Sequence, residues 1–197
     1  MKKQLNLNFH LGTHGGRRPN CGRKRIHSNS CSHKTRETIK YNYPLHINFK
    51  YKTQIRYQQF IEIFKKAISN SQKHGMRLIH YSIQFNHIHL IVESKDYIEL
   101  TKSMRSLTAT IVKLIQLQKK IKGNLQIGRY HLHILKTCRE AENAFRYVIL
   151  NELHHTGKMN FIKYSSISKN SKIVLDSPKC WLSKRATSSL ADIASGA

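Results

Sequence analysis

The sequence predicts an α+β domain in which strands and helices follow the order β-α-β-β-α-β, with one further helix after them. Three observations support this fold class. Apolar and polar residues alternate in several short segments, as they do in strands with one buried face. Two longer segments place apolar residues three and four positions apart, as amphipathic helices do. Finally, two of the strands are separated by so few residues that only an antiparallel hairpin can join them.

The first strand and the first helix are read from a change in the spacing of apolar residues. Residues 43–51 alternate between apolar and polar side chains, which predicts a strand with one buried face. From Tyr57 to Ile68 the apolar residues recur at helical spacing instead. This pattern stops at Gly75, and glycine is common just beyond a helix C-terminus.

The hairpin and the second helix follow. Residues 76–85 and 87–94 are the two hairpin strands, with the turn near Asn86. Apolar residues from Leu100 to Leu114 then mark a second amphipathic helix, which we expect to end near the next glycine, at position 123.

The fourth strand, residues 125–136, leads into the last helix of the domain. Thr137 and Glu140 form a capping box, T-x-x-E, at the start of this helix, and Gly157 lies just beyond its expected end. The order of elements is that of the ferredoxin-like split βαβ arrangement with an additional C-terminal helix. An antiparallel sheet with helices on one face leaves the other face open for a ligand or another helix. The apolar stripe of the last helix consists of Ala141, Ala144, Phe145, Val148 and Ile149.

Composition divides the 197 residues into three parts. Residues 1–41 are rich in Arg, Lys, Gly, Ser and Asn and poor in apolar residues, so they are expected to form a flexible basic arm. Residues 42–157 carry the periodic patterns of a folded domain. Residues 158–197 have weak patterning and are expected to be a basic C-terminal tail that docks through Trp181.

The charge balance points to a polyanionic partner. The chain holds 35 Lys and Arg against 10 Asp and Glu, a formal net charge of +25, which is more than solubility requires. The basic residues are spread along the chain rather than gathered on one face of a helix, which disfavours a membrane surface as the partner. No segment approaches the roughly 20 apolar residues of a membrane span, and the N-terminal residues hold no apolar signal region. We therefore expect a cytoplasmic protein whose leading partner is nucleic acid.

The cysteines suggest neither disulfides nor a zinc ribbon. The four of them are scattered without C-x-x-C spacing, so they are expected to be reduced thiols. A zinc site built from Cys21, His27, Cys31 and His33 is an alternative, although its spacing matches no common zinc finger.

The segment NHIHLIVES, residues 86–94, places two histidines on an expected strand. Because alternate side chains of a strand share a face, His87 and His89 point the same way, while the apolar residues between them point into the core. Two adjacent imidazoles are well placed to hold one metal ion or one phosphate. The spacing alone is weak evidence, since His131 and His133 repeat it in a chain of 13 histidines.

The last helix strengthens the interpretation. Tyr147 and Asn151 lie four positions apart, so they stack on one face of this helix at the edge of its apolar stripe. From that edge we expect both side chains to face the sheet. A phenol nucleophile and an amide oxygen then reach the site that the two histidines build.

Together these motifs resemble the single-tyrosine HUH transposases, and most of all the REP-associated tyrosine transposases and their insertion-sequence relatives. Residues 86–89 fill the family pattern Asn-His-φ-His, residues 128–130 its Gly-Arg-aromatic element, and residues 147–151 its Tyr-x-x-φ-Asn helix. The resemblance spans roughly residues 44–155. One departure is that many relatives continue into Asn-Pro where this chain has Glu152, which bears on the subfamily more than on the chemistry.

The resemblance implies a metal-dependent single-stranded DNA endonuclease and strand transferase, a transposase that acts at hairpin-associated sites in DNA transposition and recombination. It implies Tyr147 as the catalytic nucleophile that forms a 5′-phosphotyrosine intermediate. It implies His87, His89 and Asn151 as the ligands of Mg²⁺ or Mn²⁺. The expected partner is single-stranded or hairpin DNA, the expected location is the bacterial cytoplasm in association with the nucleoid, and monomer and dimer both remain open. The expected DNA-binding residues are Arg17, Arg18, Arg23, Lys24, Arg25, Arg129 and Tyr130.

Two other classes of protein remain open. A domesticated protein that binds DNA or RNA hairpins without cutting them would keep the charge and the aromatic residues but could lose the metal site. All four residues of the expected catalytic site are present here, which favours the enzyme. A histidine-triad nucleotide hydrolase would need a third histidine in the strand, at the position that Ile91 occupies.

Overall fold

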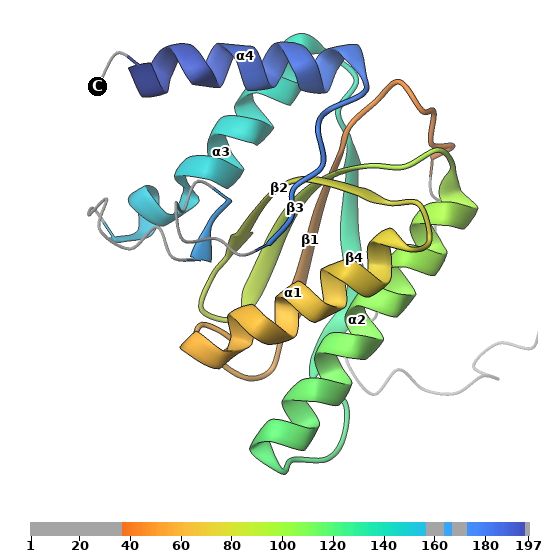
Figure 1. Cartoon of the computed structure of the whole chain (residues 1–197), viewed down its shortest axis with the longest axis vertical. Helices are drawn as coiled ribbons and strands as arrows, with labels where there is room; N and C mark the ends of the chain where they lie inside the picture. Colours follow the sequence, from red (N-terminus) through yellow and green to blue (C-terminus); the bar gives the residue numbers. More distant parts are fainter. Residues whose placement is uncertain (1–36, 157–163, 167–172, 196–197) are drawn as a thin grey trace, which may run out of the picture. The chain divides into compact units, whose positions relative to one another are not determined.

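The predicted α+β fold class is confirmed by a computed structural model, which describes residues 37–156, 164–166 and 173–195 (Figure 1). The strands and helices that the sequence predicts all form, and one helix is added after them. In chain order the elements are β1 (Leu45–Tyr51), α1 (Gln58–Gln72), β2 (Arg77–Ile83), β3 (His87–Glu93), α2 (Tyr97–Lys119), β4 (Gln126–Ile134), α3 (Cys138–Thr156) and α4 (Trp181–Ser195).

The four strands form one antiparallel sheet in the order β2-β3-β1-β4. This is the ferredoxin-like order, because each helical connection skips over one strand: α1 leads past β3, and α2 leads past β1. β1 and β3 are therefore the central pair, and β2 and β4 are the two edge strands. None of the helices in the described part of the chain is long and apolar enough to cross a membrane.

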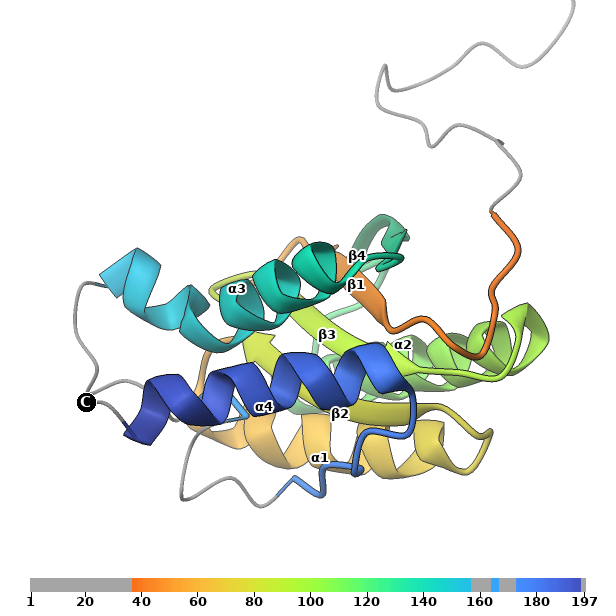
Figure 2. The ribbon, with the colours of Figure 1, turned by 90° about the horizontal axis from the view of Figure 1, so that it is seen from above.

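The main core lies between the sheet and the helices α1 and α2, which pack against each other on one face (Figure 2). Every second residue of β1 enters it, and Leu45, Ile47, Phe49 and Tyr51 are at most 2% exposed. β3 contributes its apolar residues in the same alternation, as the period of two requires. The side chains between them must therefore face the opposite side of the sheet.

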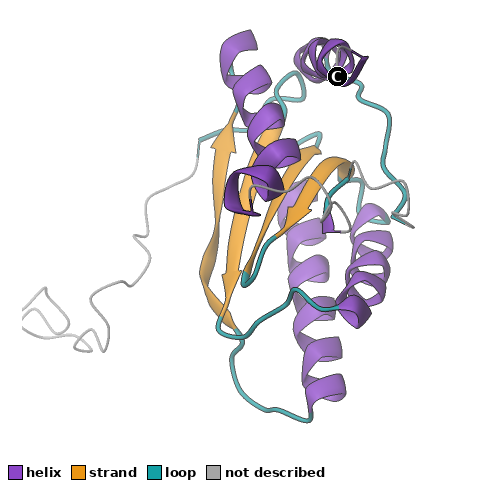
Figure 3. Cartoon of the chain, turned by 90° about the vertical axis from the view of Figure 1, so that its left-hand side faces the viewer, coloured by secondary structure: helices purple, strands orange, loops and turns teal. Residues whose placement is uncertain are grey.

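A second, smaller core lies on that opposite side, where α3 packs against β2 and β3 and α4 packs against α3 (Figure 3). Most of the predicted apolar stripe of α3 is buried in it, and Phe145 and Val148 are fully buried. The predicted capping box is confirmed, since the Glu140 N–H donates to Thr137 Oγ1 (3.2 Å) and the Thr137 N–H donates to Glu140 Oε2 (3.1 Å).

The C-terminal segment, expected to be a tail that docks through Trp181, packs on the domain through other residues. Residues 181–195 form a full helix, α4, and Leu182 and Ala186 bury its apolar side against α3. Trp181 itself is 62% exposed. A Leu and an Ala four positions apart give only a narrow apolar stripe, which explains why the sequence pattern was weak.

The segment before α4 is anchored by Glu93, the last residue of β3. Its buried carboxylate accepts hydrogen bonds from the backbone N–H groups of Lys179 (3.0 Å) and Cys180 (3.1 Å). Arg77 of β2 also lies 3.7 Å from this carboxylate. The carboxylate therefore ties the start of α4 to the sheet, at the backbone groups that would otherwise lack partners.

The same C-terminal part of the chain follows the outer edge of β2. The Asp176 N–H donates to the Leu78 carbonyl (2.7 Å), and the Leu78 N–H donates to the Asp176 carboxylate (2.9 Å). Further along the strand, the Ser166 N–H donates to the Tyr81 carbonyl (3.0 Å). Backbone groups on this edge are thus paired within the chain.

Two expected boundaries differ from the structure. Ile39, placed in the arm from composition, is buried in the main core at 5% exposure. Helix α2 runs to Lys119 and ends at Lys120, which adopts the left-handed conformation (φ 52°), rather than closer to Gly123. The arm from residue 1 to residue 36 and the alternative zinc cluster within it lie outside the described residues, so both stay predictions.

A pH effect on stability is expected from His80 of β2, which lies edge-on to Phe145 with ring centroids 5.4 Å apart. Burial lowers the pKa of His80 from 6.5 to about 4. Between these values the unfolded chain binds the proton and the folded chain does not, so stability is full above pH 6.5 and falls as the pH drops to about 4. For one histidine the loss is at most about 3 kcal/mol.

Urea unfolding at pH 7 and pH 4.5 measures this loss. His80→Gln should lose about 2 kcal/mol less than the parent protein over that interval, because glutamine does not titrate. His74→Gln, a change at an exposed histidine, is the matched control. An identical loss in the parent and in His80→Gln would show that His80 does not carry the effect.

Candidate functional site

The face of the sheet opposite the main core carries histidines from all four strands. Strand register brings them together, since Asn48 of β1 lies between His89 of β3 and His131 of β4. His46 of β1 likewise lies beside His133. The histidines of this face, which we call the histidine face, are His46, His80, His87, His89, His131 and His133.

Tyr147 of α3 lies over the middle of the histidine face. Its ring meets the His89 ring edge-on, with centroids 5.3 Å apart, and lies 6.3 Å from the His46 ring. The rings of His87 and His89 are 5.0 Å apart. Tyr147 remains 42% exposed although its ring contacts these histidines. The structure therefore brings the predicted nucleophile and the two predicted histidine ligands together.

Neighbouring side chains orient both histidines of the H-x-H motif. His87 Nδ1 lies 3.1 Å from the side-chain oxygen of Asn86, which can only accept, so Nδ1 is the protonated nitrogen of this ring. Nε2 of His87 is then the nitrogen with the lone pair that a metal ion requires. His89 Nδ1 lies 3.1 Å from His46 Nε2, so Nε2 is the nitrogen of His89 that would bind a metal ion in the proposed site.

His46 is suited to this contact because it is uncharged at neutral pH. Burial, together with the nearby His133 and His131, lowers the pKa of His46 from 6.5 to about 4. A neutral imidazole has one donor and one acceptor nitrogen, so His46 can form the hydrogen bond to His89 without placing a positive charge in the site. That matters for a site expected to hold a cation.

Two buried amides, Asn151 and Asn48, are candidates for an oxygen ligand. Asn151, one turn beyond Tyr147 on α3, is fully buried, and neither its amide oxygen nor its nitrogen has a hydrogen-bond partner in the described part of the chain. Asn48 Oδ1 is also buried without such a partner, and Asn48 pairs directly with His89 across the sheet. An unsatisfied buried amide costs free energy of about 1–3 kcal/mol, so both positions call for a ligand or a water molecule.

These residues fit a divalent metal ion. The imidazoles of His87 and His89 and an amide oxygen would make a mixed donor set that Mg²⁺ or Mn²⁺ accepts, with water in the remaining positions. Among residues 37–156, 164–166 and 173–195, no three His, Cys, Asp or Glu side chains gather as a metal cluster. The third ligand would therefore be an amide oxygen or water.

Two other predicted DNA contacts lie on β4. Arg129 is exposed on β4, whereas Tyr130 is partly buried against the main core. The five basic residues predicted to bind DNA in the arm, from Arg17 to Arg25, lie outside the described residues.

His46 and Asn48 are site residues that sequence reasoning missed. Both are polar positions of an alternating strand. Alternation predicts which face of the sheet a side chain lies on, but it does not predict which side chains of other strands lie beside it. Only the strand order, with β1 between β3 and β4, places Asn48 against His89 and lets His46 reach the same ring.

Comparisons with known proteins bear on the fold. No protein-family model matches this chain, and no curated protein matches it. Among solved structures, the chain is similar to a REP-associated tyrosine transposase bound to a REP hairpin, with a TM-score of 0.53 and 14% identity over 64% of this chain and 75% of that one.

A bacterial tRNA(His) guanylyltransferase-like protein in complex with GTP is 11% identical over 64% of this chain and 71% of that one, and its TM-score of 0.41 is too low to carry an argument. At 14% identity the first similarity establishes the fold and nothing finer. The chain thus has an α+β fold similar to that of a REP-associated tyrosine transposase.

Proposed function

We propose that this protein is a metal-dependent single-stranded DNA endonuclease and strand transferase that acts at hairpin-associated sites through a 5′-phosphotyrosine intermediate. The observation that carries the proposal is the position of Tyr147, an accessible phenol 5.3 Å from His89 between ring centroids, on a helix that crosses the H-x-H strand. The fold similarity to a transposase bound to a hairpin supports the proposal. So does the net charge of +25.

In the proposed reaction, the Tyr147 hydroxyl loses its proton to solvent as its oxygen attacks the scissile phosphorus. An O–P bond forms between Tyr147 and the 5′ side of the DNA, the bond from phosphorus to the 3′ oxygen breaks, and the leaving oxygen takes a proton to become a 3′-hydroxyl. A second 3′-hydroxyl attacks the phosphotyrosine in the reverse sense and rejoins the DNA. One tyrosine is therefore sufficient.

The remaining residues of the site position the reacting groups. Packing of the Tyr147 ring against His89 and His46 limits the directions in which its hydroxyl can point. Asn86 and His46 fix the orientations of the His87 and His89 rings. His87, His89 and Asn151 would hold the Mg²⁺ or Mn²⁺ ion, which when bound neutralises charge on the scissile phosphate and makes phosphorus more electrophilic.

Removal of one hydroxyl tests the proposed nucleophile. Tyr147→Phe should fold and bind hairpin DNA as the parent does but form no covalent adduct, because the ring and its packing remain while the attacking oxygen is lost. Gel separation of protein–DNA adducts formed on single-stranded hairpin DNA is the measurement. Tyr97→Phe, at a partly exposed tyrosine at the start of α2, is the matched control and should form adduct normally.

Adduct formation by Tyr147→Phe would remove Tyr147 from the mechanism. A parent protein that binds hairpin DNA but forms no adduct with any divalent ion would instead match the non-cutting alternative.

Metal titration of cleavage identifies the amide ligand. If Asn151 is a ligand, Asn151→Ala should raise the Mn²⁺ concentration for half-maximal cleavage about 10-fold or more. Asn151→Asp should retain or tighten metal binding, because it keeps the oxygen and adds a charge. DNA affinity without metal should barely change in either variant.

Asn48→Ala is the informative comparison, because Asn48 is the other buried amide beside the histidines. A shift in metal requirement for Asn48→Ala together with none for Asn151→Ala would transfer the ligand role to Asn48. A parental metal requirement in both variants would leave water as the third ligand.

The basic arm should contribute affinity and not chemistry. Deletion of residues 1–36 removes the arginines and lysines predicted to bind phosphates, so DNA binding should weaken and its dependence on salt should flatten. The slope of log K against log salt should decrease by roughly 0.7 for each lost contact with single-stranded DNA. Cleavage at saturating DNA should persist, and an unchanged slope would mean that the arm does not contact DNA.

A further inference from the structure

An open groove with exposed aromatic residues lies beside the N-terminal end of α3. Three segments line it, the approach to β1 (residues 41–43), the connection from β4 to α3 (136–138) and the start of α4 (179–182). Its volume is about 670 Å³, which is enough for a nucleotide. We call it the aromatic groove.

Two aromatic residues of this groove, Tyr41 and Trp181, belong to neither core, whereas Tyr43 packs against both. Trp181 is 62% exposed and Tyr41 is 45% exposed, whereas Leu182 and Ala186 already fill the contact between α3 and α4. A tryptophan that adds so little to packing and lies at the edge of a groove is typical of a binding surface.

Trp181 is held in place although it is exposed. The guanidinium group of Arg185, one turn further along α4, lies 5.7 Å from the centre of its ring, and Glu142 of α3 in turn holds Arg185 at 3.5 Å. Glu93 fixes the backbone immediately before the ring through the N–H groups of Lys179 and Cys180. The indole is thus a supported platform rather than a side chain on a loose tail.

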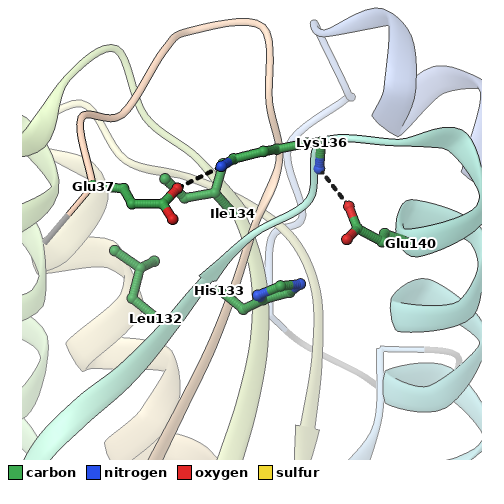
Figure 4. A pocket seen from close by; sticks show the side chains of 6 residues that line it. All are labelled: Glu37, Leu132, His133, Ile134, Lys136 and Glu140. Atoms are coloured by element: carbon green, nitrogen blue, oxygen red, sulfur yellow. Dashed lines mark hydrogen bonds and ion pairs between the residues drawn. The ribbon is translucent and has the colours of Figure 1, made fainter.

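The groove is lined by two lysines. Lys136 and Lys179 are among the residues that line it, and none of its described lining residues is acidic. Lys136 is oriented by Glu37, 2.6 Å away, while its backbone N–H donates to Glu140 (2.9 Å), as Figure 4 shows. Lysines beside exposed aromatic rings suit a phosphate attached to a flat base, and a chain of net charge +25 favours such a polyanion over a peptide.

We propose that the aromatic groove binds an unpaired base of the DNA substrate, stacked on Trp181 with Tyr41 beside it and with its phosphate near Lys179. This rests on the proposed function, because it assigns a second contact to the same DNA. Stacking on an aromatic side chain contributes about 1–3 kcal/mol per base and does not require a particular sequence. Single-stranded DNA next to a hairpin supplies such bases, whereas paired DNA does not.

The groove is too far from the reaction centre to hold the scissile nucleotide itself. Cys138 in the groove and Tyr147 are nine residues apart on α3, which corresponds to roughly 13 Å along the helix axis. The base in the groove therefore lies a few nucleotides from the phosphate that Tyr147 attacks. Because this distance is fixed, binding of a base in the groove would determine which phosphate of the unpaired strand lies at Tyr147.

The single tryptophan of the chain makes the test direct, because all tryptophan fluorescence of the protein comes from this groove. We would titrate full-length Tyr147→Phe protein, which should bind DNA without cutting it, with three DNA hairpins. One carries unpaired flanks on both strands, one is blunt, and one carries flanks of the same length made of abasic nucleotides. Fluorescence reports stacking on Trp181, and anisotropy of a dye on the DNA reports binding.

The flanked hairpin should quench Trp181 fluorescence, and the blunt and abasic hairpins should bind with little quenching. Trp181→Ala should weaken binding of the flanked hairpin about 10-fold and leave the blunt hairpin unaffected, while Trp181→Phe should recover most of the loss. Tyr97→Ala, a partly exposed aromatic residue away from the groove, is the control. Equal quenching by flanked and blunt hairpins, or parental affinity of Trp181→Ala for the flanked hairpin, would overturn the proposal.

Adduct formation by the parent protein keeps the two proposals separate. Quenching by the flanked hairpin without any adduct would support base binding in the groove and contradict the proposed nuclease activity. Adduct formation without quenching would support the nuclease activity and contradict base binding in the groove.

Discussion

The register of β1 against β3 is the constraint on which the rest of the molecule depends. Side chains alternate along a strand, so a shift of one residue would exchange the two faces of the sheet. In the observed register, Ile47 pairs with Leu90 toward the main core and Asn48 pairs with His89 toward α3. The same pairing that completes the core therefore assembles the histidine face, and neither can be displaced without the other.

The elements that the sequence predicts correctly are those specified by local patterns. Alternation and helical spacing gave the strands and first three helices, and the capping box at Thr137 and Glu140 fixed the start of α3. The H-x-H pair needed no tertiary information, because two residues on one strand share a face in any fold. The position of Tyr147 over that face followed from the order of elements together with the stripe of α3.

What escaped prediction depends on contacts between distant parts of the chain. α4 is stabilised by its packing on α3 and by the carboxylate of Glu93, which lies 86 positions before Lys179, so its own sequence carries little signal. Ile39 was assigned to the arm by the composition of its neighbours, but one apolar side chain is enough to join a core. His46 and Asn48 became site residues only through the strand order. Composition and periodicity describe one segment at a time. The position of α4, the burial of Ile39 and the roles of His46 and Asn48 depend instead on contacts between two segments.

Residues 164–166 and 173–178 pair with the outer side of β2, so the two edges of the sheet are not equivalent. An edge strand with unpaired backbone groups is a template for a strand from another molecule. At β2 the chain itself occupies part of that template, through Ser166 and Asp176. Within the described residues β4 is the other edge, and no strand pairs with its outer side. Addition of a strand from another molecule is therefore hindered at the part of β2 that Ser166 and Asp176 occupy.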